Sequence, residues 1–167
     1  MKNIVPFVVL CLFVLTGHDV AAGLLKDQAY GSEGLKRTYD LYLPDNRPGS
    51  KSPLVLLLHG HMGDADVMTG ENRKKAPYKL WLKIAEREGW MVLIPDGEWG
   101  SDKHRGWNDC RADAKTNPKL DDVTFLTALI DSVATRYPVD TKRLYAHGTS
   151  NGGNITSRSR AYNGYII

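Results

Sequence analysis

The chain has 167 residues, of which 42% are hydrophobic and 25% are charged. This length and balance are typical of a single globular domain and exclude a disordered or fibrous chain. The formal net charge is only +3, which gives no electrostatic support for a nucleic-acid partner.

Residues 1–22 have the pattern of a cleaved signal peptide. Lys2 supplies a positive start, an apolar run covers residues 4–15, and the small residues 20–22 precede Gly23, where cleavage is expected. The alternative is a membrane anchor, but the apolar run is shorter than the about 20 residues that a spanning helix needs. We therefore predict a secreted or periplasmic protein with no stable membrane anchor after cleavage, whose mature part is residues 23–167.

The first half of this mature part predicts two buried strands and a helix behind an outer strand. Arg37–Leu43 alternates between apolar and polar residues, which suits an outer antiparallel strand. Leu54–Leu58 and Met91–Ile94 are unbroken apolar runs, typical of strands that are covered on both faces in a parallel sheet. Between them, Tyr78–Glu88 has apolar residues at helical spacing, and Gly89 can end that helix in the left-handed conformation.

A long polar loop, from residue 96 to about residue 119, leads to the second half. Asp121 or Asp122 can cap the next helix, whose apolar residues recur at three- and four-residue steps as far as Tyr137. Arg143–His147 then predicts a third core strand. The alternation of strands and helices indicates an α/β fold: a mostly parallel sheet with flanking helices and right-handed crossovers.

A glycine-rich motif follows the third core strand directly. It reads Gly148-Thr149-Ser150-Asn151-Gly152-Gly153, which is G-x-S-x-G at a strand end. In that context the motif predicts a tight strand-to-helix turn that holds a nucleophilic serine, here Ser150, above the sheet edge. Side chains at Gly148 or Gly152 would collide with neighbouring backbone in such a turn. The alternative is a glycine-rich turn with an incidental serine.

A second loop supports the interpretation of Ser150 as a nucleophile. His59-Gly60-His61 follows the first core strand, where α/β-hydrolases place one of the two amides of the oxyanion hole. The backbone N–H groups of His61 and Asn151 are our candidates for that hole. A rival interpretation takes His59 and His61 as an H-x-H metal pair, but the sequence does not continue with the ligands of a metal hydrolase. We predict neither a metal nor a cofactor.

The stretch from Arg37 to Gly153 resembles the secreted polyhydroxybutyrate depolymerase-like and feruloyl-type esterases of the α/β-hydrolase class. The segments that carry the resemblance are 37–39 with 43–44, 57–60, 95–97, 106–108, 121–123 with 125, 139–140 with 143–145, and 148–153. The resemblance implies a serine hydrolase of carboxylic esters that acts outside the cytoplasm, through an acyl-enzyme, on a polyester or on feruloyl or acetyl esters of a polysaccharide.

The sequence departs from that pattern after Ser150. Hydrolases of this class place an acid and then a histidine downstream of the serine, but the 17 residues after Ser150 contain no Asp, Glu or His. The polar tail around residues 157–160 looks unsuited to a helix, and we hypothesise a premature stop or frameshift just after Ile155. The sheet would then be incomplete after the nucleophile strand, and its open edge favours self-association.

The sequence leaves alternatives for the whole chain and for three residues of the loop and the following helix. The chain is either an esterase or a truncated, non-catalytic relic or ligand-binding protein of the same fold. His104, in the long loop, is the candidate for a substitute base. Trp107 in the same loop either lines a substrate groove or pins the loop to the surface, and Asp122 is first interpreted as a helix cap.

Overall fold

The computed structural model describes residues 22–48, 50–71 and 77–163. The expected signal peptide therefore lies outside the described residues, apart from Ala22. Among the described helices, none has the length and apolar character that crossing a bilayer requires.

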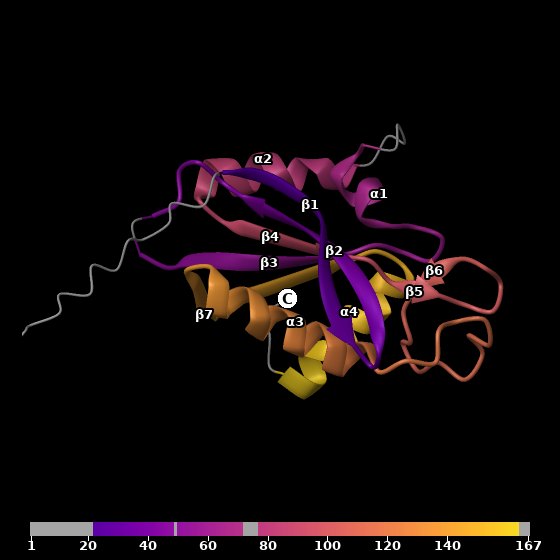
Figure 1. Cartoon of the computed structure of the whole chain (residues 1–167). Helices are drawn as coiled ribbons and strands as arrows, with labels where there is room; N and C mark the ends of the chain where they lie inside the picture. Colours follow the sequence, from indigo (N-terminus) through magenta and orange to yellow (C-terminus); the bar gives the residue numbers. More distant parts are fainter. Residues whose placement is uncertain (1–21, 49, 72–76, 164–167) are drawn as a thin grey trace, which may run out of the picture.

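A five-stranded mixed sheet forms the centre of the molecule (Figure 1). Its strands are β1 (Gly23–Ser32), β2 (Leu35–Leu43), β3 (Ser52–Leu58), β4 (Met91–Pro95) and β7 (Val139–Gly148), in the spatial order β1-β2-β4-β3-β7. The strands β4, β3 and β7 are parallel, whereas β2 runs antiparallel to both β1 and β4. The expected mostly parallel core with an antiparallel flank is confirmed.

Helices cover both faces of this sheet. The helices α1 (Ala65–Thr69) and α2 (Leu80–Glu88), with the short 3-10 turn Pro77–Lys79, lie on one face, and α3 (Asp122–Arg136) and α4 (Asn151–Asn163) lie on the other (Figure 1). Two apolar clusters correspond to these layers. The larger one joins α3 and Ile155 of α4 to the sheet, and the smaller one joins α1 and α2 to Leu57, Val92 and Ile94.

The strand ends bring two loops together. In the parallel pair β3–β7, Leu58 lies opposite Gly148, so the carboxyl ends of both strands lie at the same end of the sheet. The segment after Leu58 and the turn after Gly148 are therefore neighbours, and the amide of Thr149 donates to the carbonyl of Leu58 at 3.2 Å. The candidate residues predicted from the sequence lie at this end of the sheet.

Several details differ from the sequence-based expectations. The strand β2 is not the outer strand, because β1 pairs with its free side. The long loop contains a small hairpin of β5 (Glu98–Trp99) and β6 (Arg105–Gly106). Asp121 caps α3 by accepting from the Thr124 amide, so Asp122 is the first helical residue and not the cap.

The expectation that the tail is unsuited to a helix is wrong. The helix α4 runs on to Asn163, with Ile155, Thr156 and Ser159 buried. Its hydroxyl groups bond back to the helix: Thr156 donates to the Gly152 carbonyl at 2.8 Å, and Ser157 donates to the Gly153 carbonyl at 3.1 Å. This local bonding satisfies the hydroxyl of Thr156 where the helix is buried.

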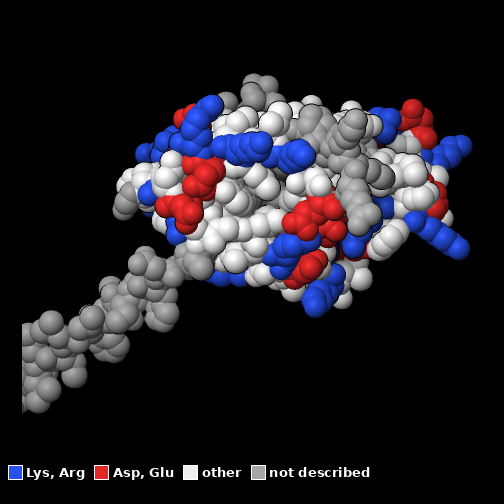
Figure 2. Space-filling view, turned by 90° about the horizontal axis from the view of Figure 1, so that it is seen from above, with Lys and Arg blue, Asp and Glu red and all other residues white. Residues whose placement is uncertain are grey.

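The face that α1 and α2 cover carries charges of both signs. Basic and acidic side chains are interspersed there (Figure 2). This mixture agrees with the small net charge of +3 and does not form the single-sign surface that a polyanionic partner requires.

Candidate active site

Ser150 occupies the turn between β7 and α4. Its φ is 52°, in the left-handed region that residues other than glycine seldom adopt, and its side chain is exposed. Such a backbone conformation costs on the order of 1–3 kcal/mol and persists only where the surroundings enforce it. The turn therefore holds a serine hydroxyl out at the sheet edge, directly before the N-terminus of a helix.

The glycines around Ser150 leave room for neighbouring backbone. A Cβ atom at Gly148 would overlap the carbonyl of Gly152, and one at Gly152 would overlap the carbonyls of Leu58 and His59. These carbonyls belong to a helix and to a core strand end, which cannot retreat as a flexible side chain can. The sequence G-x-S-x-G is thus required sterically by this turn.

The two candidate oxyanion amides belong to neighbouring segments, the loop after β3 and the start of α4. The loop of Gly60 is packed on the turn of Ser150, residues 148–152, which we call the elbow. A Cβ at Gly60 would lie 3.2 Å from the carbonyl oxygen of Thr149 and 3.4 Å from Cβ of Ser150. The Met62 amide donates to Arg105 at 2.9 Å, but the His61 amide has no backbone acceptor within the described part of the chain. Asn151 begins α4, where the first amides of a helix are unpaired and favour negative charge.

The side chain of Asn151 ties the elbow to the long loop. It is buried, accepts from the Trp107 amide at 2.7 Å and donates to the Trp107 carbonyl at 3.1 Å. The Trp107 indole N–H in turn donates to the His59 carbonyl at 2.8 Å. Trp107 is 0% exposed, so it does not line an open groove. It pins the loop, which is the second of the two interpretations drawn from the sequence.

A buried carboxylate completes this connection. Asp109 accepts from Asn151 at 2.8 Å, from Asn154 at 3.1 Å, from Asn117 at 3.0 Å and from Arg111 at 2.8 Å. Burial alone would raise the pKa of Asp109, but the hydrogen bonds from Arg111 and the asparagines hold it below its usual range. The ionised carboxylate therefore clamps the first turn of α4 to the loop.

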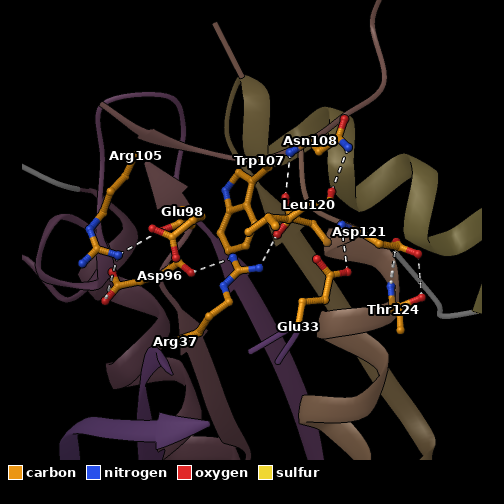
Figure 3. Close-up of polar contacts among 12 residues, drawn as sticks. Glu33, Arg37, Asp96, Glu98, Arg105, Trp107, Asn108, Leu120, Asp121 and Thr124 are labelled. Atoms are coloured by element: carbon orange, nitrogen blue, oxygen red, sulfur yellow. Dashed lines mark hydrogen bonds and ion pairs between the residues drawn. The ribbon is translucent and has the colours of Figure 1, made fainter. Parts of the chain in front are cut away.

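An ion pair beneath the loop fixes its far end. Arg37 on β2 contacts Asp122 at 2.5 Å, and both side chains are almost inaccessible, at 2% and 0% exposed. Arg37 also donates to the Asp96 carbonyl at 3.1 Å and lies below Trp107, while Asn108 bonds to Leu120 (Figure 3). Burial raises the pKa of Asp122, against the opposing effects of Arg37 and the Asn108 amide.

The first histidine of the H-x-H pair is fully engaged. His59 is 0% exposed, its Nδ1 lies 2.7 Å from the Gly60 carbonyl, and its Nε2 accepts from the Gly97 amide at 2.8 Å. Burial lowers the pKa of His59, so the ring is neutral and has no lone pair free for a metal. Within the described ranges, no three His, Cys, Asp or Glu side chains are grouped to hold a metal ion.

The remaining histidines near the site have different surroundings. His61 Nε2 lies 2.9 Å from Asp102, and its ring centroid lies 5.9 Å from that of exposed His104. His147 packs against the rings of Tyr78 and Trp81. Sequence reasoning missed the roles of Asp102 and Asp109, because no local motif marks a carboxylate whose partners are 40 residues away.

Comparison with known proteins places this arrangement in a family. Residues 37–162 match the model of the esterase PHB depolymerase family. The chain is 30% identical over 124 residues to a bifunctional acetylxylan esterase/xylanase of Neocallimastix patriciarum. The aligned part covers 74% of this chain and 16% of that protein. It is also 27% identical over 157 residues to a poly(3-hydroxybutyrate) depolymerase of Ralstonia pickettii. Here the aligned part covers 89% of this chain and 32% of that protein.

A solved structure shows the same fold. The native crystal structure of sOPH matches with a TM-score of 0.63 and 27% identity, over 89% of this chain and 50% of that chain. The chain spans half the length or less of each of these three relatives. With its α/β-hydrolase fold and a family match over residues 37–162, the chain belongs to the esterase PHB depolymerase family of carboxylic-ester hydrolases.

Proposed function

We propose that Ser150 is the nucleophile of a secreted carboxylic-ester hydrolase. The observation that carries this proposal is the backbone of Ser150 itself, held at a φ of 52° at the start of α4 with its side chain exposed. Strain of this kind costs stability and is concentrated at functional sites. In the described part of the structure, the Ser150 hydroxyl makes no hydrogen bond that would offset this cost.

The reaction follows from the groups around the hydroxyl. The Oγ atom of Ser150 attacks the ester carbonyl carbon, and the oxygen of the tetrahedral intermediate lies between the amides of His61 and Asn151. Removing one such donor typically costs about 3 kcal/mol of transition-state stabilisation. The alcohol leaves with a proton, and water then hydrolyses the acyl-enzyme on Ser150.

The proposed substrates are polyesters or the feruloyl and acetyl esters of polysaccharides. They are supported by the names of the relatives, a poly(3-hydroxybutyrate) depolymerase and an acetylxylan esterase. We place the enzyme outside the cytoplasm because residues 1–22 have the pattern of a cleaved signal peptide, so that its mature part starts at Gly23.

The outer edge of β7 is a further element of the proposal. Among the described strands, β7 pairs with β3 alone, so its second edge presents unpaired backbone groups. We propose that this edge supports association with another chain. Size-exclusion chromatography with light scattering tests it, and a strictly monomeric species at high protein concentration would contradict it.

A hydrolysis assay tests the function. Purified protein is given p-nitrophenyl acetate, and its rate is compared with those of Ser150→Ala and of Ser157→Ala, an exposed serine two turns along the same helix. We expect Ser157→Ala to keep the wild-type rate and Ser150→Ala to lose it. Equal rates in all three proteins would reject Ser150 as nucleophile, and equal rates no faster than the assay without protein would favour the non-catalytic alternative.

A further inference from the structure

A polar cavity lies where β1, β2, the start of α1 and the segment after β4 meet. Its volume is about 170 Å³, and its charged lining consists of Arg105 and five aspartates, Asp27, Asp40, Asp64, Asp66 and Asp96. The aspartates extend from residue 27 to residue 96 and form no local ligand motif. The lining includes no residue of the elbow, so this cavity is separate from the site of Ser150.

Negative charge is in excess around this cavity. The ammonium group of Lys26 lies 2.8 Å from Asp66 and 2.9 Å from Glu71, so it is already shared between two carboxylates. The guanidinium of Arg105 lies 3.8 Å from Asp96 (Figure 3). Even with both of these cations counted, the five carboxylates of the lining exceed them by three. Carboxylates that share a site repel one another, and a bound cation relieves that repulsion.

Asp40, in the middle of β2, has a buried oxygen without a partner. Its Oδ1 atom accepts from the Asp27 amide at 2.9 Å, whereas Oδ2 is inaccessible to solvent and has no hydrogen-bond partner within the described ranges. The residue is only 2% exposed. Buried polar atoms normally have a partner, so this oxygen lacks a positive group that the rest of the described chain does not supply.

The carboxyl group of Asp40 faces the cavity. Burial raises its pKa, and the neighbouring carboxylates of Asp27 and Asp96 act in the same direction, against the Asp27 amide and the charge of Lys26. Because Asp27 and Asp96 belong to the lining, the charges that act on Asp40 are those of the cavity itself. A cation placed there would act on the least favourably placed carboxylate of the group.

The size of the cavity and the spacing of its ligands indicate which cation fits. Within the described ranges no three acidic side chains converge as direct ligands of one ion, and 170 Å³ corresponds to about five water molecules at roughly 30 Å³ each. Mg²⁺ keeps several of its waters and is held in proteins by one or two carboxylates, at about 2.1 Å. A hydrogen-bonded water would lie farther from Oδ2, at about 2.7–2.8 Å, so an oxygen that is closed to water suits a small ion.

We propose that this cavity binds one partly hydrated Mg²⁺ ion, which contacts Asp40 Oδ2 directly and the other carboxylates through its water molecules. The ion joins β1, β2, α1 and the segment after β4, and it stabilises the fold. This inference differs from the sequence-based expectation of no metal, because only the folded chain brings these aspartates together. It does not depend on the function proposed for Ser150.

Thermal unfolding with and without Mg²⁺ tests the site. The purified protein is freed of metal with EDTA and dialysed, and its unfolding midpoint is measured as MgCl₂ is added, beside NaCl of equal ionic strength. Asp40→Asn keeps an acceptor for the Asp27 amide and removes the charge that contacts the ion. The matched control is Asp131→Asn, which removes the same charge from an exposed position on α3.

We expect the wild-type midpoint to rise with MgCl₂ and then level off, about 5–10 °C higher at a hundredfold excess over Kd, and Asp131→Asn should do the same. Asp40→Asn should show no rise beyond that in NaCl. Without Mg²⁺ it should unfold no earlier than wild type, since it removes a buried charge that lacks a partner. A purely structural role for Asp40 would instead make the variant less stable whether or not Mg²⁺ is present.

A second variant decides the question if Asp40→Asn folds poorly. Asp27 is exposed and has a φ of 52°, a left-handed conformation that asparagine tolerates. Asp27→Asn should therefore fold, and it should need several-fold more Mg²⁺ for the same rise. A wild-type midpoint that rises no more in MgCl₂ than in NaCl, or a Mg²⁺ response that is the same in wild type and in both variants, would overturn the site. Neither result depends on ester hydrolysis, so a failure of the proposal for Ser150 would be recognised separately.

Discussion

Replacing Asp122 by asparagine should destabilise the protein strongly, because it leaves the Arg37 charge buried without a counter-charge. Arg37 is 2% exposed and its Nε already has no hydrogen-bond partner in the described structure. In the variant its acceptors would be neutral ones, the asparagine amide oxygen and the Asp96 carbonyl. Removing one member of a buried ion pair costs about 3–5 kcal/mol. Single domains are stable by about 5–15 kcal/mol, so this loss would be a large share of the total.

Urea unfolding followed by tryptophan fluorescence measures the effect. The matched control is Asp140→Asn, which breaks a pair of the same chemistry with Arg143 at 2.7 Å on the exposed surface. We expect a small change of midpoint for the control and a large one for Asp122→Asn. The double variant Arg37→Met/Asp122→Leu should recover much of the loss, since no charge is then buried. Equal midpoints for Asp122→Asn and Asp140→Asn would refute this reasoning.

Two further predictions concern the elbow and its clamp. Gly152→Ala should lower the free energy of unfolding by about 1–3 kcal/mol, because its Cβ would overlap the carbonyls of Leu58 and His59. The control is Gly31→Ala, whose Cβ meets no atom within 4 Å and which should be tolerated. Similar urea midpoints for the two variants would count against the steric argument. The lowered pKa of Asp109 means that its ionised form stabilises the fold above the ordinary carboxyl pKa of about 3.9 and that this stability is lost as pH falls through the folded value. The difference in unfolding free energy between wild type and Asp109→Asn should therefore be largest near pH 7 and shrink below about pH 4, and a difference that stays constant with pH would contradict it.

The core of the fold could be predicted from sequence because its signals are local. Leu54–Leu58 and Met91–Ile94 are unbroken apolar runs, and both form strands buried on each face. Gly89 ends α2 at a φ of 70°, as a glycine after a helical pattern should. The order of these elements was enough to identify a parallel core and the turn at Ser150.

The strand β1 and the helix α4 could not be predicted in the same way. In β1 a bulge between Leu25 and Gln28, with Asp27 at a φ of 52°, interrupts the alternation that marks a strand. In α4 the apolar pattern is weak, and the helix depends on hydroxyl groups such as that of Thr156 that bond back to the preceding turn.

The polar framework of the site depends on contacts distant in sequence. Asp109 reaches Asn151, 42 residues along the chain, and Asp122 reaches Arg37 across 85 residues. Neither pairing has a sequence signal, because many acidic and basic residues could be matched equally well. The motif identifies the serine, and only the folded chain shows what holds it.

Trapping of an acyl-enzyme tests the central claim most directly. Protein mixed with p-nitrophenyl acetate is quenched in acid within the first turnover, digested and analysed by mass spectrometry. The account predicts one added acetyl group on the peptide that contains Ser150, and none on that peptide in Ser150→Ala. An acetyl group found only on other residues, or release of p-nitrophenol that is unchanged in Ser150→Ala, would contradict it.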